Sequence, residues 1–182
     1  QHPREHKMSK ETKHICFFNS HKKWGGGEKW HMDAAQFLSA QHIRTSIYAH
    51  GAGELYNKVE NSVPKISVSL SNLSFLNPFA YFKLVHLFKK QGFDTIILCL
   101  PIDVKVAGVA AKIAGIKHII YRRGSAIPIK NSCYNRFLFS KIITHIIANS
   151  EATKETILQH NSSLFPQEKI TVLYNGIDIS PV

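Results

Sequence analysis

The chain has 182 residues, 44% of them hydrophobic and 19% charged, which is typical of a globular protein with one buried core. Its 23 Lys and Arg against 12 Asp and Glu give a formal charge of +11, which favours an anionic partner such as a phosphate-bearing ligand or an anionic membrane surface. The basic residues are dispersed, without a zinc-finger or aromatic RNA-binding pattern, so we expect no nucleic-acid partner.

The apolar runs are too short to predict a membrane-spanning helix, and no signal-peptide core follows the charged N-terminus. Cys16, Cys99 and Cys133 are widely spaced, as in reduced cytosolic proteins, so we expect a cytoplasmic location. Residues 1–8 are interpreted as a tag or a disordered lead, followed by one domain over residues 9–180.

Apolar β-branched runs alternate with helical patterns along the chain. In chain order they predict a strand at 14–20, a helix at 28–41, a strand at 44–50, a polar loop at 51–62, strand 65–69, helix 78–91, strand 94–100, helix 102–114, strand 117–123, helix 131–141, strand 144–150, a helix from residue 151, and a last strand and turn within 169–178. This order predicts an α/β fold, a Rossmann-like doubly wound and mainly parallel sheet of about seven strands with helices on both faces.

Three glycines, Gly25, Gly26 and Gly27, follow the first strand and precede the first helix. Ligands of such sheets gather beyond the carboxyl ends of the strands. Glycines leave room there and allow positive φ, while the free amides of a helix N-terminus favour an anion. The segment does not match the dinucleotide fingerprint GxGxxG, and a flexible turn is the alternative interpretation.

A second candidate lies after the strand at 117–123, where Arg122 and Arg123 precede Gly124. Two guanidinium groups at a strand end could hold a phosphate or a carboxylate, although a solvated basic edge is the plainer alternative. We expect Gly26 and Gly27 to lie beside Arg123 on one edge of the sheet. The histidines lack metal-binding spacing, so no metal is expected.

The helix predicted over 78–91 is basic and broadly apolar. It could lie on a membrane surface, but packing against the sheet is the favoured interpretation.

Taken in order, the segments resemble the N-terminal domain of the family 4 (group 1) glycosyltransferases, whose GT-B fold has two Rossmann-like domains. The matching pieces are WGGGEKWHMDAAQFLSAQHI, FDTIILCLPID, AAKIAGIKHIIYRRG, HIIANSEATKETIL and EKITVLYNGIDIS. The resemblance implies sugar transfer from a nucleotide-sugar to an acceptor with retention of configuration, and no other cofactor. It also implies that the C-terminal donor-binding domain is missing here, so we expect the chain alone to be inactive.

Site roles follow from the resemblance by position. Gly25, Gly26, Gly27, Arg122 and Gly124 would bind the donor phosphates and sugar. The family often has His-Gly where this chain has Arg123-Gly124, so Arg123 is predicted to be catalytic, acting on a phosphate or an acidic acceptor. The predicted acceptor-side or interdomain residues are Lys23, Ser150, Glu151, Asn175 and Gly176.

Three functions stay open at this point. The first is a glycosyltransferase of cell-surface polysaccharide or lipopolysaccharide synthesis, acting on a glycan or lipid-linked acceptor, with peripheral contact to the inner face of an anionic plasma membrane. The second is a nucleotide-sugar epimerase of the GT-B type. The third is a non-catalytic module that binds a polyanion or a membrane surface.

Overall fold

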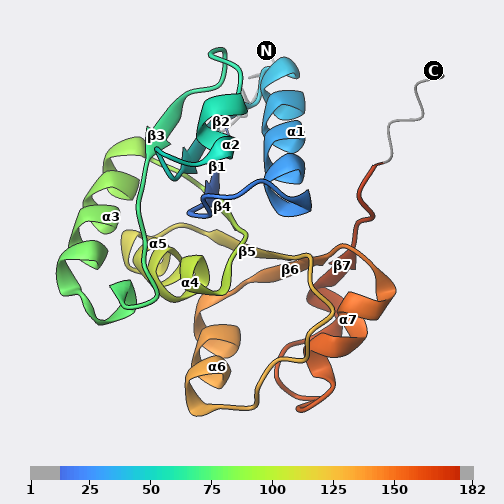
Figure 1. Ribbon diagram of the computed structural model, residues 1–182. Coiled ribbons are helices and arrows are strands. Elements are labelled where there is room, and N and C mark those ends of the chain that lie inside the picture. Colours follow the sequence, from blue (N-terminus) through green and yellow to red (C-terminus); the bar gives the residue numbers. More distant parts are fainter. Residues whose placement is uncertain (1–12, 177–182) are drawn as a thin grey trace, which may run out of the picture.

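The computed structural model describes residues 13–176, and its centre is one seven-stranded sheet in the order β3-β2-β1-β4-β5-β6-β7 (Figure 1). The strands are β1 (His14–Asn19), β2 (Arg44–Ala49), β3 (Lys65–Ser67), β4 (Thr95–Leu98), β5 (His118–Arg123), β6 (His145–Ala148) and β7 (Ile170–Val172). Every pairing within this sheet is parallel. The predicted doubly wound, Rossmann-like sheet is confirmed; residues 1–8 and the end of the turn predicted within 169–178 lie outside the described residues.

Helices connect the strands. They are α1 (Gly26–Ala40), α2 (Glu54–Lys58), α3 (Pro78–Gln91), α4 (Pro101–Asp103), α5 (Val109–Ala114), α6 (Cys133–Phe137) and α7 (Glu151–Leu158), with the 3-10 turns η1 (Ser74–Leu76) and η4 (Gln167–Lys169) and the π-helical segments η2 (Val104–Gly108) and η3 (Leu138–Ile142). The predicted loop at 51–62 was wrong in part, because it contains α2. The predicted helices at 102–114 and 131–141 are found, the first with π-helical η2 in its middle and the second with π-helical η3 at its end.

The ends of α3 follow the sequence signals. The Asn77 side chain accepts a hydrogen bond from the Phe79 amide, Pro78 takes the first helical position, and Gly92 ends the helix at a φ of 65°. That left-handed conformation suits a residue without a Cβ.

The two faces of the sheet have separate apolar cores, because successive strand residues point to opposite sides. Phe17 of β1 packs with Ala35 of α1 on one face, whereas its neighbour Phe18 packs with Leu84 and Phe88 of α3 on the other. Alternation therefore decides which helix each strand side chain meets.

The strand order reverses at β1, which lies between β2 and β4. At such a point the connections leave the sheet in opposite directions, which opens a crevice beyond the carboxyl ends of the strands. Within residues 13–176, no helix is both long and apolar enough to cross a membrane.

Candidate functional site

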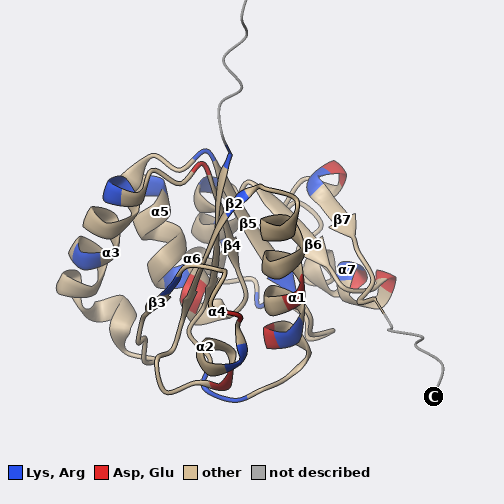
Figure 2. Cartoon of the chain, turned by 90° about the horizontal axis from the view of Figure 1, so that it is seen from above, with Lys and Arg blue, Asp and Glu red and all other residues tan. Residues whose placement is uncertain are grey.

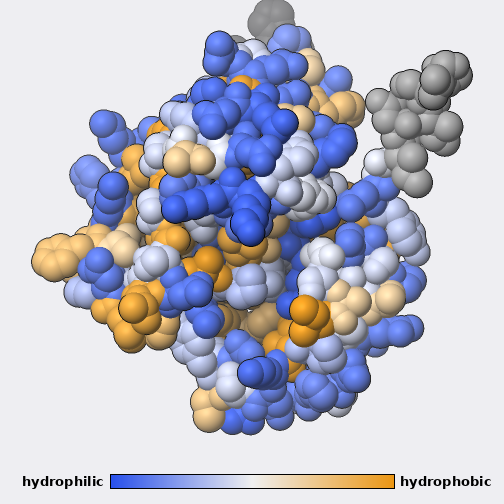
Figure 3. Space-filling model, in the orientation of Figure 1, coloured by the Kyte–Doolittle hydropathy of each residue, from blue (hydrophilic) through white to orange (hydrophobic). Residues whose placement is uncertain are grey.

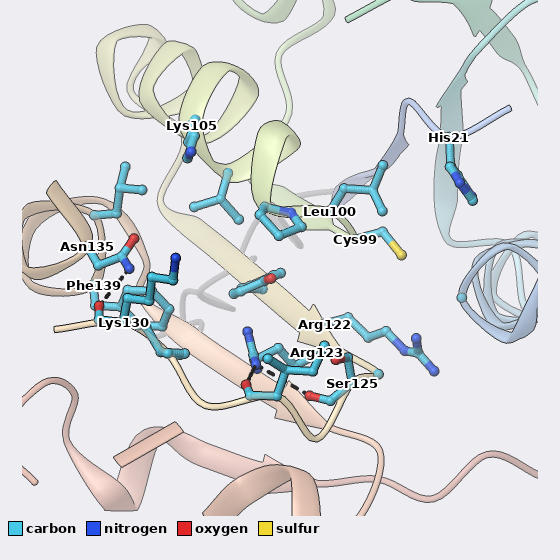
Figure 4. A pocket seen from close by; sticks show the side chains of 18 of the residues that line it. His21, Cys99, Leu100, Lys105, Arg122, Arg123, Ser125, Lys130, Asn135 and Phe139 are labelled. Carbon is cyan, nitrogen blue, oxygen red and sulfur yellow. Dashed lines mark hydrogen bonds between the residues drawn. The ribbon is translucent and has the colours of Figure 1, made fainter. Parts of the chain in front are cut away.

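A pocket of about 650 Å³ lies beyond the carboxyl ends of β4 and β5 (Figure 4). The start of α1 and the β4–α4 connection line one end, and the loop after β5 together with α6 and η3 lines the other. Gly27, Arg122, Arg123 and Gly124 all contribute to the wall. The structure therefore brings Gly27 and the arginine pair to the same edge of the sheet and into the same pocket, whereas Gly25 and Gly26 do not line it.

Of the two glycines that begin α1, Gly27 is needed for space, and neither has an unusual backbone angle. Gly25 is the N-cap, in an extended conformation, and positive φ among the described glycines occurs only at Gly92 and Gly115. A Cβ on Gly27 would lie 2.9 Å from Cys99 Sγ and 3.4 Å from an Arg122 guanidinium nitrogen, whereas one on Gly26 would meet only Asn175 Nδ2, at 4.0 Å. The expected use of positive φ was wrong, but the expected close approach is confirmed at Gly27.

A buried hydrogen-bond network fixes the start of α1 against the end of β1. Asn19 Nδ2 donates to Glu28 Oε1 at 3.0 Å, and the ring Nδ1 of His21 lies 3.2 Å from the same oxygen. The His21 amide donates to Asn19 Oδ1, also at 3.0 Å. The Glu28 carboxylate lies in the first turn of α1, where it interacts favourably with the helix dipole. The glycine segment is thus held in place from both sides.

Arg122 is the arginine that meets the glycine segment. It is only 4% exposed, and its Nη2 donates to Asn175 Oδ1 at 2.9 Å while its guanidinium lies over the Trp30 ring. No ion pair joins it to a carboxylate within residues 13–176. Its charge is therefore available to an anion in the pocket.

Arg123, its neighbour, lies on the other face of the sheet, because strand residues alternate in direction. Its Nη2 donates to the carbonyl oxygens of Ser125, at 3.3 Å, and Ile127 (Figure 4). It lines the same pocket but bonds to its own loop. The expectation that Gly26 and Gly27 lie beside Arg123 is corrected: the adjoining residue is Arg122, and the catalytic role of Arg123 stays a prediction.

The remaining predicted residues are more dispersed. Asn175 joins the site through Arg122, and a Cβ on the following Gly176 would meet no atom within 4 Å. Ser150 is the N-cap of α7, accepting from the Thr153 amide at 3.1 Å, and exposed Glu151 lies on a separate depression along α7. Lys23 is exposed in the loop before α1. Lys23, Ser150 and Glu151 do not line the pocket.

Sequence reasoning missed Cys99, directly after β4, and Asp103 of α4. Burial raises the pKa of the Cys99 thiol to about 12, so it is neutral. The fully buried Asp103 accepts from Ser20 Oγ at 2.5 Å and from the Leu100 amide at 3.1 Å, and burial, partly offset by these hydrogen bonds, raises its pKa to about 7. Only the polar Asn19-Ser20-His21 run after the first strand could have indicated this network.

His31 was also missed as a neighbour of the site. Burial first, and the charge of Arg122 second, lower its pKa to about 3, and neither ring nitrogen has a hydrogen-bond partner within the described residues. A neutral imidazole therefore packs against Phe17 and Trp30 beneath Arg122. Residues 13–176 contain no group of three or more His, Cys, Asp or Glu that could hold a metal ion.

The fold and the position of its pocket define one half of a GT-B protein, and the comparisons agree. The sequence model described as Glycosyltransferase Family 4 matches residues 24–181. The chain belongs to this family. No curated protein matches it significantly.

Solved structures share the fold at low sequence identity. The Anabaena protein HepE, in complex with UDP and glucose, is 22% identical to this chain with a TM-score of 0.69. The match covers 93% of this chain and 47% of the HepE chain. The lipopolysaccharide outer core galactosyltransferase WaaB is 17% identical with a TM-score of 0.67 over 93% of this chain and 47% of its own. UDP-GlcNAc 2-epimerase from Neisseria meningitidis, bound to UDP-GlcNAc, is 13% identical with a TM-score of 0.60 over 88% and 45%. The chain spans about half the length of these structures.

Proposed function

We propose that the protein carrying this chain is a glycosyltransferase that moves a sugar from a nucleotide-sugar donor to a glycan or lipid-linked acceptor. The observation that supports it most is the meeting of the α1 N-terminus and buried Arg122 in one pocket of a family 4 chain. Free helix amides and a guanidinium both favour an anion, and the donor diphosphate is such a group. The UDP and glucose in the HepE structure support this assignment.

The finer parts of the proposal follow the family. Transfer proceeds with retention of configuration, without a metal or another cofactor, in cell-surface polysaccharide or lipopolysaccharide synthesis; the likeness to WaaB supports the pathway. In a GT-B enzyme the second half supplies the other wall of the cleft, so residues 1–182 alone are inactive. No nucleic acid takes part.

We place the enzyme in the cytoplasm, in peripheral contact with the anionic inner face of the plasma membrane. The support is a surface at the start of α3, here called the η1–α3 face and made of Leu73, Leu76, Phe79 and Phe82, which are 69%, 68%, 79% and 73% exposed. Figure 3 shows apolar side chains gathered at this end of the molecule. Lys83 follows Phe82 in α3, and residues 61–93 contain no acidic residue, so the face suits an anionic bilayer (Figure 2).

Two alternatives have specific support. The likeness to UDP-GlcNAc 2-epimerase favours an epimerase of the same fold. The exposed apolar face and the charge of +11 favour a non-catalytic module that binds a polyanion or a membrane.

The deciding experiment is product analysis with the full protein, a panel of nucleotide-sugars, and glycan and lipid-linked acceptors. A new glycosidic bond with the anomeric configuration of the donor supports the proposal. Formation of an isomerised nucleotide-sugar without any acceptor overturns it in favour of the epimerase, and no turnover of any donor favours the module.

Arginine variants locate the chemistry in the same assay. Arg123→Ala should lower turnover by about tenfold or more, the usual effect of losing a charge-assisted contact in the transition state. Arg44→Ala, at the opposite edge of the sheet, is the control and should leave turnover unchanged. Near-normal activity of Arg123→Ala would remove Arg123 from the site.

A further inference from the structure

The half of the pocket away from the glycines has an apolar floor. Val104, Tyr121, Ile129, Leu138 and Phe139 line it, and each is at most 7% exposed. Val104 belongs to η2, Tyr121 and Ile129 to β5 and the loop that follows it, and Leu138 and Phe139 to η3. The floor therefore joins three separate parts of the chain. Such a surface favours an apolar group over a fully hydrated one.

Cations border this floor. Lys105 and Lys130 come from η2 and from the loop after β5, on opposite walls, and Figure 4 shows both at the end of the pocket away from Cys99. Arg123 lies between that end and Arg122, and its buried Nε has no hydrogen-bond partner within the described chain. Among the described lining residues the one carboxylate is Glu28, whose Oε1 is already engaged by Asn19 and His21. The bordering charge is therefore positive and not neutralised within the pocket.

The cationic end lies beside two aromatic rings from η1 and α6. Phe75 of η1 and Tyr134 of α6 have ring centroids 6.4 Å apart, and Lys105 Nζ lies 5.4 Å from the first ring and 5.7 Å from the second. At the other rim Ile127 is 69% exposed. Aromatic rings from η1 and α6 thus flank Lys105 at the cationic end of the pocket.

We infer that this half of the pocket binds a phosphate-bearing amphiphile, with its apolar part on the floor and its phosphate between Lys105, Arg123 and Lys130. The inference rests on the proposed function, since it selects the lipid-linked acceptor over a free glycan. An apolar chain gains free energy from the floor, and a phosphate gains charge-assisted hydrogen bonds from the cations. The apolar end and the phosphate end of such a molecule thus match the apolar floor and the cationic border of the pocket.

Binding of geranyl monophosphate to the full protein, measured by calorimetry without a nucleotide-sugar, tests the inference. Methyl phosphate and geraniol are the comparison ligands, since each carries one part of the probe. Geranyl monophosphate should bind about tenfold or more tightly than either, because methyl phosphate lacks the apolar chain that the floor would bury and geraniol lacks the phosphate that the cations would bind. Equal affinity for geranyl and methyl phosphate would overturn the role of the floor.

The double variant Lys105→Gln/Lys130→Gln tests the cations. It should weaken binding of geranyl monophosphate about tenfold and leave geraniol binding unchanged, because only the phosphate contacts are lost. The matched control is Lys89→Gln/Lys90→Gln in the last turn of α3, which removes the same charge away from the pocket. Equal weakening by both variants would show a general charge effect and overturn the assignment.

Failure of this inference can be distinguished from failure of the proposed function. If geranyl monophosphate does not bind while the enzyme transfers sugar to a soluble glycan, this inference fails and the proposed function stands. If the probe binds in the predicted manner but no sugar is transferred to any acceptor, the pocket assignment stands and the proposed function fails.

Discussion

At the scale of single residues, the site depends on which side of a strand each arginine takes. Arg122 and Arg123 are neighbours in the sequence, yet one meets Asn175 and Trp30 and the other bonds to the loop of Ser125 and Ile127. Successive side chains of a strand point to opposite faces of the sheet, so the two arginines lie on different faces. The two arginines therefore have different surroundings, Arg122 beside α1 and Arg123 on the loop after β5, and only Arg122 adjoins the proposed diphosphate site.

Among the three glycines before and at the start of α1, Gly27 is the one whose replacement has the closest contact with another element. In Gly27→Ala the new methyl group would lie 2.9 Å from Cys99 Sγ, so either the Cys99 side chain or the start of α1 must shift. We expect a loss of about 1–3 kcal/mol in the free energy of unfolding, as for other overpacked sites. Urea denaturation measures it.

Gly26→Ala is the control for that variant, since its methyl group meets only Asn175 Nδ2 at 4.0 Å and alanine favours a helix more than glycine does. We expect it to be neutral or stabilising. Equal destabilisation by both variants would show that helix geometry, and not the contact with Cys99, requires the glycines.

Asp103 should make stability depend on pH. Burial raises its pKa from 3.8 to about 7, so between these values the folded protein holds a proton that the unfolded chain has released. The free energy of unfolding should therefore fall as the pH rises through this window, by at most about 1.4 kcal/mol per pH unit, and level off above it.

Comparison of the native protein with Asp103→Asn isolates this effect, since the other titrating groups are common to both. The difference in unfolding free energy between them should change across the window and stay constant above it. Parallel pH profiles would mean that Asp103 stays ionised in the folded protein.

At the scale of the elements, α3 combines two roles that the sequence presented as alternatives. Leu84 and Phe88 are buried against the sheet, which confirms the expected core packing. Phe79 and Phe82 in its first turns are largely exposed, and its lysines, Lys83 among them, have no acidic counterpart on the helix. The same helix can therefore stabilise the fold and present a basic apolar surface.

Vesicle sedimentation tests the proposed membrane contact of the η1–α3 face. Phe79→Ser/Phe82→Ser should weaken binding to vesicles that contain phosphatidylglycerol by about tenfold or more, because burying each phenyl ring contributes about 1.5–3 kcal/mol at most. Added salt should weaken binding further, since the lysine contribution is screened.

Phe37→Ser on α1 is the matched control, because Phe37 is 65% exposed and lies on a different element. It should leave vesicle binding unchanged. Unaltered binding by the η1–α3 variant would contradict the assignment, and a change in its oligomeric state by light scattering would assign the face to a second copy instead.

At the scale of the whole molecule, the seven-stranded sheet sets two walls of different chemistry around one pocket. The wall at α1 is polar and glycine-rich, and the wall at η2 and η3 is apolar with lysines at its border. In a GT-B protein a second half faces this edge, and the chain spans about half the length of the structures it resembles. The pocket is accordingly one side of a proposed cleft.

Much of this could be predicted from the sequence, because local signals determined it. The β-branched runs, the Asn77 cap and Gly92 specified their elements, and strand-helix alternation implied the parallel sheet with Gly27 and Arg122 at one edge. Helix α2 was missed because five residues carry too little periodicity.

Only the tertiary structure decided which side chains meet. Nothing local distinguishes Arg122 from Arg123 until the register of β5 against β4 and β6 is known, and the contact of Gly27 with Cys99 joins residues on different elements. The burial of Asp103 and the exposure of Phe79 are likewise properties of packing. The sequence by itself determined the elements and the family, because these depend on local propensity and order; the chemistry of the pocket depends on long-range contacts, which only the folded chain forms.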